Sequence, residues 1–240
     1  YFEVILMEIE DSRYENSQRW GTYREKTKNE LPKKLLVKLL ENLKPGDAIE
    51  LGPGAGIDSL YMLKNGWNVL GIDNAPETEE DIRQLIRKNE EELENRFSFI
   101  NRNFEDLELP KNSCDLLVGF NSLFFCRPEK FKDFFQNLAD AIRPGGYLLI
   151  NLLGKNDDWN KTQSQEKTFL SREEILDLLK EKTAIILLNK IDLDTEYKNA
   201  LKKSSLPRTH FSRLNNQAKA RNTRLQDDEN IIADLFSRVN

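Results

Sequence analysis

The feature that most constrains the fold is a cluster of three glycines between a short strand and a helix. Residues 48–51 predict a strand, and Gly52-Pro53-Gly54-Ala55-Gly56 follows it directly. Residues 57–64 read as a helix, and residues 68–72 read as a second strand that closes at Asp73. Glycine lets a backbone turn sharply and lets a ligand lie against main-chain N–H groups that a Cβ would cover. The helix adds the positive end of its dipole, so this stretch predicts a nucleotide-binding site.

Asp73 strengthens this interpretation. An acid roughly twenty residues after such a loop, at the end of the second strand, is placed to accept hydrogen bonds from ribose hydroxyls. A tight strand–helix turn also needs glycine for packing alone. Because Asp73 follows the loop at this spacing, nucleotide binding is favoured over packing alone as the reason for the glycines.

Strands and helices go on alternating after Asp73. The first helix of the domain is expected at residues 31–43, where a leucine stripe starts at Leu31, and a capping box at residues 171–174 marks the start of a late helix. Other helices are expected at residues 79–94 and 131–142, and strands at residues 97–100, 115–120, 147–153 and 183–191. This alternation predicts a Rossmann-like, doubly wound α/β sheet, mostly parallel, with helices on both faces. Residues 208–214 are expected to add a C-terminal antiparallel strand.

The chain is expected to contain one large domain with two appendages. Residues 1–30 are interpreted as an N-terminal extension or lid, residues 31–220 as the domain and residues 221–240 as a helical tail. Residues 1–7 are too short to span a membrane and lack a basic flank, so no signal peptide is expected. No apolar run approaches the roughly 20 residues of a membrane helix, so no membrane association is predicted.

Composition removes several classes of chemistry. The chain has one histidine and two cysteines, which excludes a zinc ribbon, His-rich zinc chemistry and a disulfide scaffold. No metal site is therefore predicted, and reduced thiols predict a cytoplasmic location. The charge sums to −5, so the whole chain is not a generic polyanion binder.

The loop itself narrows the choice of nucleotide. A dinucleotide fingerprint has a third glycine three residues after the second, and here that position is Ile57. Glu50, just before the loop, would repel a pyrophosphate and would suit a ligand that carries an ammonium and a sulfonium. No lysine follows the loop, which excludes a P-loop.

Residues 50–56 resemble motif I of the class I S-adenosylmethionine-dependent methyltransferases. Asp73 is similar to the ribose-binding acid of that family, and residues 103–105 to its adenine-contacting segment, in which Asp is commoner where Asn103 stands. Residues 115–121 resemble motif IV. The likeness extends over about residues 20–220, including the turn at residues 142–147. Within the family, Trp20, Tyr23 and the segments 66–67 and 169–174 look most similar to small-molecule enzymes of the tellurite-resistance and thiopurine type.

The resemblance implies S-adenosylmethionine as cofactor, a small-molecule acceptor, and a role for each matching residue. Glu50 would lie near the ammonium, Asp73 would hold the ribose, and Phe104 would contact the adenine. The cofactor-binding residues implied in this way are Glu50, Gly52, Gly54, Gly56, Asp73, Asn74, Asn103, Phe104 and Asn121. Trp20 and Tyr23, on a polar stretch, are predicted to form a lid, and Trp159 to close over the acceptor from the loop at residues 155–167.

Methyl transfer from a sulfonium is an in-line displacement, and a soft or anionic acceptor needs little beyond alignment. A neutral oxygen or nitrogen acceptor would need a base, for which His210 is the candidate. Cys126 is expected to be a buried small hydrophobe. No Pro-Cys dipeptide occurs, and residues 121–124 are not Asn-Pro-Pro-Tyr, which argues against two kinds of DNA methylation.

Other functions stay open at this point. A methyltransferase-fold module without catalysis is one alternative, and a nicotinamide-dependent oxidoreductase, disfavoured by Ile57 and Glu50, is another. The acid-free basic stretch at residues 202–224 leaves nucleic acid binding open, although a solvated surface is the favoured interpretation. The apolar stripe at residues 231–239 would dock on the domain or on a second subunit as a homodimer.

Overall fold

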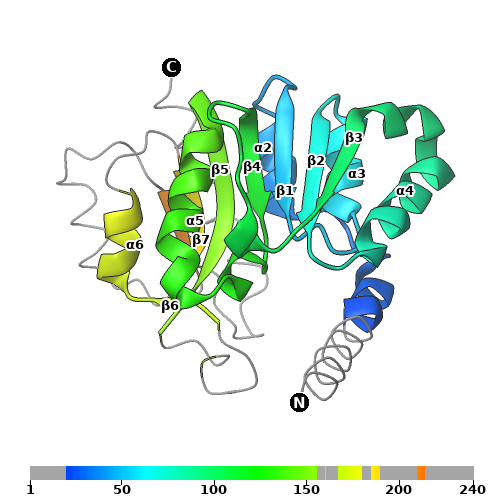
Figure 1. Cartoon of the computed structure of the whole chain (residues 1–240). Coiled ribbons are helices and arrows are strands. Elements are labelled where there is room, and N and C mark those ends of the chain that lie inside the picture. The colour runs from blue at the N-terminus through cyan, green and yellow to red at the C-terminus, as the bar shows by residue number, and fades with distance from the viewer. Residues whose placement is uncertain (1–19, 156–159, 161–166, 180–184, 190–209, 214–240) are drawn as a thin grey trace, which may run out of the picture.

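The computed structural model describes residues 20–155, 160, 167–179, 185–189 and 210–213 of the 240-residue chain. These residues form a sheet with the strand order β3-β2-β1-β4-β5-β7-β8, and β6 pairs with β5 (Figure 1). The strands are β1 (Asp47–Leu51), β2 (Asn68–Asp73), β3 (Phe97–Asn101), β4 (Cys114–Gly119), β5 (Ile142–Gly154), β6 (Phe169–Leu170), β7 (Ile185–Asn189) and β8 (His210–Arg213). All of their pairings are parallel, which confirms the predicted Rossmann-like fold.

The last described strand corrects one expectation, because β8 runs parallel to β7 and not antiparallel. Ile186 pairs with His210 and Asn189 with Arg213, so residue numbers rise together along both strands. A parallel connection needs a crossover of roughly a dozen residues or more, and residues 190–209 are enough for one. A short apolar pattern carries no information on strand direction, which is why the expectation was wrong.

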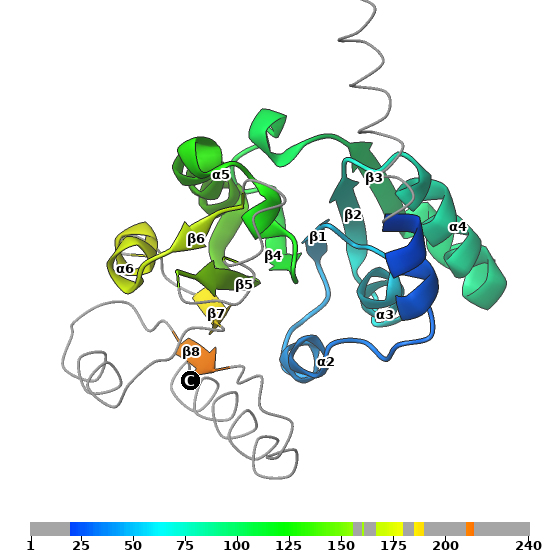
Figure 2. The same cartoon turned by 90° about the horizontal axis from the view of Figure 1, so that it is seen from below.

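Helices cover both faces of the sheet. They are α2 (Lys34–Leu40), α3 (Ile57–Lys64), α4 (Glu77–Glu90), α5 (Pro128–Ala141) and α6 (Arg172–Leu179), with short 3₁₀ turns η1 (Glu91–Arg96), η2 (Phe104–Asp106) and η3 (Leu123–Phe125). Figure 2 shows α2, α3 and α4 on one side and α5 and α6 on the other. In the described part of the chain, no helix has the length and apolar character needed to cross a membrane.

The core lies in two layers because successive side chains of each strand point to opposite faces. Ala48 and Leu116 pack toward α2, α3 and α4, whereas Ile49 and Leu117 pack toward α5. Cys126 is fully buried in the α5 layer, as expected of a small hydrophobe, and its burial raises the pKa of the thiol to about 12. Both cysteines in the chain are free thiols.

Several element boundaries differ from the sequence expectation. The helix expected over residues 31–43 begins only at Lys34, after Pro32, and Leu31 is 83% exposed instead of belonging to the buried stripe. The α-helix expected to end at Glu94 ends at Glu90 and continues as η1. Residues 143–146, expected as a turn, lie within the long strand β5.

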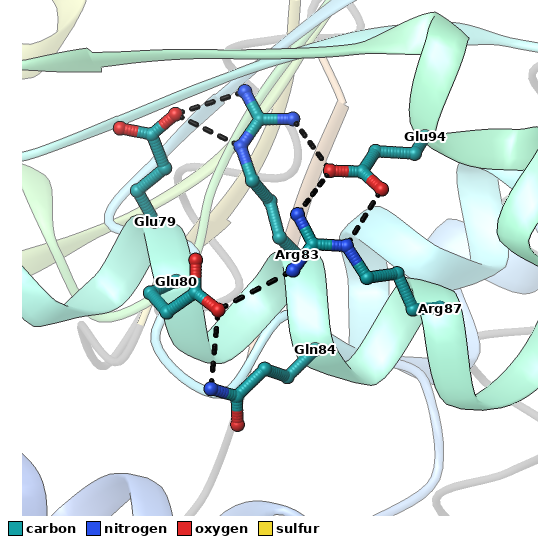
Figure 3. Close-up of polar contacts among 6 residues, drawn as sticks. All are labelled: Glu79, Glu80, Arg83, Gln84, Arg87 and Glu94. Atoms are coloured by element: carbon teal, nitrogen blue, oxygen red, sulfur yellow. Dashed lines mark hydrogen bonds and ion pairs between the residues drawn. The ribbon is translucent and has the colours of Figure 1, made fainter.

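Charged side chains brace η1 against α4. The carboxylate of Glu94 accepts hydrogen bonds from Arg87 Nη2 at 2.7 Å and from Arg83 Nη1 at 3.3 Å (Figure 3). Arg83 also pairs with Glu79 at 2.8 Å on the same helix. The network stabilises α4, the helix that follows β2. The first turn of α4 borders the cleft described next.

Candidate functional site

A large cleft lies at the carboxyl ends of the central strands. Leu51 pairs with Ile72 and Asp73 with Asn101, so β1, β2 and β3 end at the same edge of the sheet. The cleft has a volume of about 1970 Å³. Its lining includes these residues predicted from the sequence: Trp20, Tyr23, Glu50, Gly52, Gly54, Asp73, Asn74, Asn103, Phe104 and Asn121.

The three loop glycines all have positive φ, yet they serve different purposes. A Cβ on Gly52 would lie 2.5 Å from Ser122 Cβ, and one on Gly56 would lie 2.7 Å from Ile82 Cγ1. A Cβ on Gly54 would meet only Tyr23, at 3.7 Å. Gly54 is therefore the loop position at which a ligand has room to approach the backbone. Gly56 caps α3 and packs against α4, and it is not part of the cleft lining.

Glu50 is a buried carboxylate under the glycine loop. It is 4% exposed, and the hydroxyl of Ser59 donates a hydrogen bond to its Oε2. In the described part of the chain, no basic side chain lies within ion-pair distance of it. Burial, with the negative charge of Asp58, raises the pKa of Glu50 to about 8. The site therefore favours a cationic ligand beside this carboxylate.

Asp58 is a second buried acid of the cleft, and sequence reasoning missed it. It lies in the first turn of α3, and its Oδ1 accepts the Lys33 N–H at 2.8 Å. Burial raises its pKa from the ordinary value. Its position directly after the glycine loop was the available signal, but its contact with Lys33 depends on tertiary structure.

Asp73 closes β2 and faces the cleft. Its Oδ1 accepts the N–H of Ala75 at 2.9 Å, which fixes the carboxylate relative to the turn. Burial raises the pKa of Asp73, and the charge of Arg24 acts in the opposite direction. Next to it, Asn74 Nδ2 donates to Asn103 Oδ1 at 3.0 Å, so the segments after β2 and β3 are joined at their tips.

Phe104 provides an aromatic surface beside Asn103. One face of its ring stacks on Phe134 of α5, with centroids 5.2 Å apart and planes 15° apart. The side chain is only partly buried and borders the cleft. A flat ring with its back supported can contact a planar ligand.

Residues 20–27 are helical and form the aromatic side of the cleft. The ring of Trp20 meets Phe125 edge-on at 5.1 Å and Tyr23 edge-on at 6.0 Å. Arg24, 8% exposed, donates from Nε to Asp81 Oδ2 on α4 at 2.7 Å. Arg24 was not predicted, because its role depends on a contact between distant segments.

The structure tests neither His210 nor Trp159, the two remaining residues predicted from the sequence. His210 begins β8, the last strand of the described sheet. Trp159 lies outside the described residues, as do the stripe at residues 231–239 and most of the stretches 155–167 and 202–224. His210 as a base and Trp159 as a closing residue stay predictions.

Comparisons with known proteins agree with this geometry. Residues 49–150 match the family described as a methyltransferase domain. A putative S-adenosyl-L-methionine-dependent methyltransferase from Methanococcus maripaludis shares the fold at 19% identity, over 69% of this chain and 83% of its own, with a TM-score of 0.51. A putative methyltransferase from Haloferax volcanii, solved in complex with the activator Trm112, matches at 20% identity over 67% of this chain and 71% of its own, with a TM-score of 0.52.

Two further findings show how far the similarity to known proteins extends. The chain spans 57% of the PH0226 protein from Pyrococcus horikoshii OT3, at 19% identity over 53% of this chain and with a TM-score of 0.43. A search of curated proteins returned no match.

The matched residues 49–150 contain the glycine loop, Glu50 and Asp73, so the methyltransferase-domain match falls on the cleft. That family description implies S-adenosylmethionine as the methyl donor.

Proposed function

We propose that the chain transfers the methyl group of S-adenosylmethionine to a small-molecule acceptor by in-line displacement. The observation that carries the proposal is the pairing of two acids in one cleft. Glu50 is buried beside the glycine loop with no ion-pair partner among the described residues, and Asp73 closes the neighbouring strand. An ammonium and a ribose are the groups that these two carboxylates would hold.

The other cleft residues have roles consistent with this assignment. Gly52 and Gly54 would adjoin the methionyl part, where Gly54 leaves room for a ligand. Asn74, Asn103 and Phe104 would surround the adenine, with hydrogen-bonding groups beside a supported ring. Asn121 would face the methionyl part, and Gly56 shapes the loop.

The cofactor would supply a methyl group on a sulfonium, which is already a good leaving group. The protein's task is then to align the acceptor and to exclude water. Trp20, Tyr23 and Phe125 form an aromatic wall that suits an acceptor with an apolar ring or chain. This wall is the feature that favours a small-molecule acceptor.

Finer assignments belong to the proposal as well. The likeness to tellurite-resistance and thiopurine enzymes rests on Trp20, Tyr23 and two short segments of the sequence. His210 as a base, Trp159 as part of a closing loop, and a homodimer through residues 231–239 are further parts of it. Each of these can fail without affecting the cofactor assignment.

A methyltransferase fold that binds the cofactor without catalysis is the second candidate. Asn103, where the family commonly has Asp, and a cleft whose described lining has no histidine or cysteine favour it. Turnover decides between the two, since both predict binding. Mass spectrometry of small-molecule extracts incubated with the chain and methyl-labelled S-adenosylmethionine would reveal a labelled product if the first proposal holds. Cofactor binding with no labelled product from any extract would favour the second.

Binding is tested first by calorimetry with S-adenosylhomocysteine and NAD. We expect S-adenosylhomocysteine to bind and NAD not to bind, because the carboxylate of Glu50 would repel the pyrophosphate of NAD. Asp73→Asn should weaken the binding of S-adenosylhomocysteine by about 1.5–3 kcal/mol, the range of hydrogen bonds to charged groups. Asparagine can still accept the Ala75 N–H, so the turn should keep its shape.

Asp133→Asn, on the exposed surface of α5, is the matched control and should leave affinity unchanged. Binding of NAD without binding of any S-adenosyl ligand would contradict the proposed function and favour the oxidoreductase.

A further inference from the structure

Asn121 lies two residues after the end of β4 and has an unusual backbone conformation. Its φ is +55°, and the only other non-glycine residue with positive φ in the described ranges is Asn112, at +54°. This region costs free energy for a residue with a Cβ, although asparagine tolerates it better than most. The loop after β4 must therefore be held in this conformation by other contacts.

Asn151, from β5, provides those contacts. It is 2% exposed, and its Oδ1 accepts the backbone N–H of Asn121 at 2.6 Å. Its Nδ2 donates to Oδ1 of Asn121 at 2.8 Å. The two hydrogen bonds join the side chain of one residue to both the backbone and the side chain of the other.

The chemistry of these bonds fixes the orientation of both amides. A backbone N–H can only donate, so the atom of Asn151 that faces it is the carbonyl oxygen. The other atom of Asn151 is then a donor, and the atom of Asn121 that it meets must be an oxygen. Nδ2 of Asn121 is left over, with no hydrogen-bond partner among the described residues.

The same loop is attached to the glycine loop. Ser122 donates from Oγ to the carbonyl oxygen of Leu51 at 2.6 Å, and its Cβ occupies the place that a side chain on Gly52 would need. Asn121 lines the cleft beside these residues, in the same cavity as Glu50. A buried acid for an ammonium and a free amide N–H₂ for an oxygen thus border one pocket.

We infer that Asn151 is a positioning residue that turns the Asn121 amide so that its N–H₂ group binds the carboxylate of the methionyl part of the cofactor. The inference rests on the proposed function. Glu50 and Asn121 together would recognise an α-amino acid by its two charged groups. A reversed Asn121 amide would present an oxygen to that carboxylate and would repel it.

The test compares S-adenosylmethionine with its decarboxylated form, which differs only by that carboxylate. In Asn121→Gly, glycine takes the positive φ without cost, so the fold is kept while the amide is lost. We expect affinity for S-adenosylmethionine to fall about tenfold to a hundredfold, the effect of losing a hydrogen bond to a charged group. Affinity for the decarboxylated form should stay unchanged. Asn112→Gly, at the other positive-φ asparagine and outside the cleft lining, is the matched control and should change neither affinity.

Asn151→Asp tests the positioning role directly. Aspartate still accepts the Asn121 N–H but cannot donate to its oxygen, so the Asn121 amide should reverse and the same selective loss should appear. Equal losses for both ligands in Asn121→Gly would indicate a structural role and overturn the inference. Unchanged affinities for both ligands would also overturn it. Failure of the unmodified chain to bind either ligand would instead overturn the proposed function.

Discussion

At the scale of single residues, the cleft holds two buried acids that form no ion pair among the described residues, and the nearby charge of Lys33 offsets the rise of their pKa values only in part. Glu50 and Asp58 are 4% and 8% exposed, and burial raises the pKa of each. Buried carboxylates without cations oppose folding when they ionise. Groups arranged for a ligand commonly have this cost, because binding sites are built for the bound state.

Replacing Glu50 should therefore reduce the pH dependence of stability. Its folded pKa of about 8 lies above its ordinary 4.5, so the folded state binds the extra proton in between. The free energy of unfolding is then highest below the ordinary pKa and falls as pH rises toward the folded pKa, by at most about 1.4 kcal/mol per pH unit. Glu50→Gln keeps an acceptor for Ser59 and cannot ionise. We expect the variant to lose less stability than the parent between about pH 5 and about pH 8, measured by urea denaturation.

Glu50→Gln should also weaken the binding of S-adenosylhomocysteine, because the ammonium of the ligand no longer has the Glu50 carboxylate beside it. Opposite effects on stability and on affinity would separate a ligand-directed acid from a purely structural one. The control is Glu92→Gln, an exposed glutamate of η1, which should follow the parent in both measurements. A steep pH dependence that persists in Glu50→Gln would mean that Glu50 is not the titrating group.

At the scale of elements, local sequence predicted which segments are strands and helices better than it predicted their ends. Residues 116–119 are apolar, lie in β4 and are all buried, and such runs are hard to mistake. The direction of β8 and the break of α4 at Glu90 are set by contacts with other segments. A strand pattern is the same in either direction, and Glu94 finds its arginines only when the chain folds back (Figure 3).

The start of α6 is an element boundary that local sequence did predict. The Ser171 N–H donates to Glu174 Oε2 at 2.5 Å, and the Glu174 N–H donates to Ser171 Oγ at 3.2 Å, which is the predicted capping box. Ser171→Ala should lower the free energy of unfolding by about 1 kcal/mol, because an N–H of the first turn loses its acceptor. Chemical denaturation measures this change. Ser98→Ala, at an exposed position of β3, should have a smaller effect, and equal effects would argue against the cap.

At the scale of the whole molecule, the cleft is assembled from segments that are far apart in the sequence. The glycine loop and Asp73 were predictable, because each follows a strand and parallel strands end at one edge. Asp58, Arg24 and Asn151 were not, because nothing local indicates which distant group each one meets. Geometry rather than composition thus completes the candidate site.

Arg24 provides the connection between the N-terminal helix and the rest of the molecule. That helix, dark blue beside α4 in Figures 1 and 2, carries Trp20 and Tyr23 at the cleft, and Arg24 ties it to Asp81 at 2.7 Å. Arg24→Gln should loosen it, so the amides of residues 20–27 should exchange with deuterium about tenfold faster or more, because a partly buried charged hydrogen bond is lost. S-adenosylhomocysteine should slow this exchange in the parent if the helix covers the bound ligand.

Lys28→Gln is the control, because it removes an exposed ion pair with Glu25 from the same segment and should leave exchange nearly unchanged. Equal exchange in the two variants and the parent would show that Arg24 does not hold the helix in place. Exchange in the parent that the ligand leaves unchanged would contradict the lid.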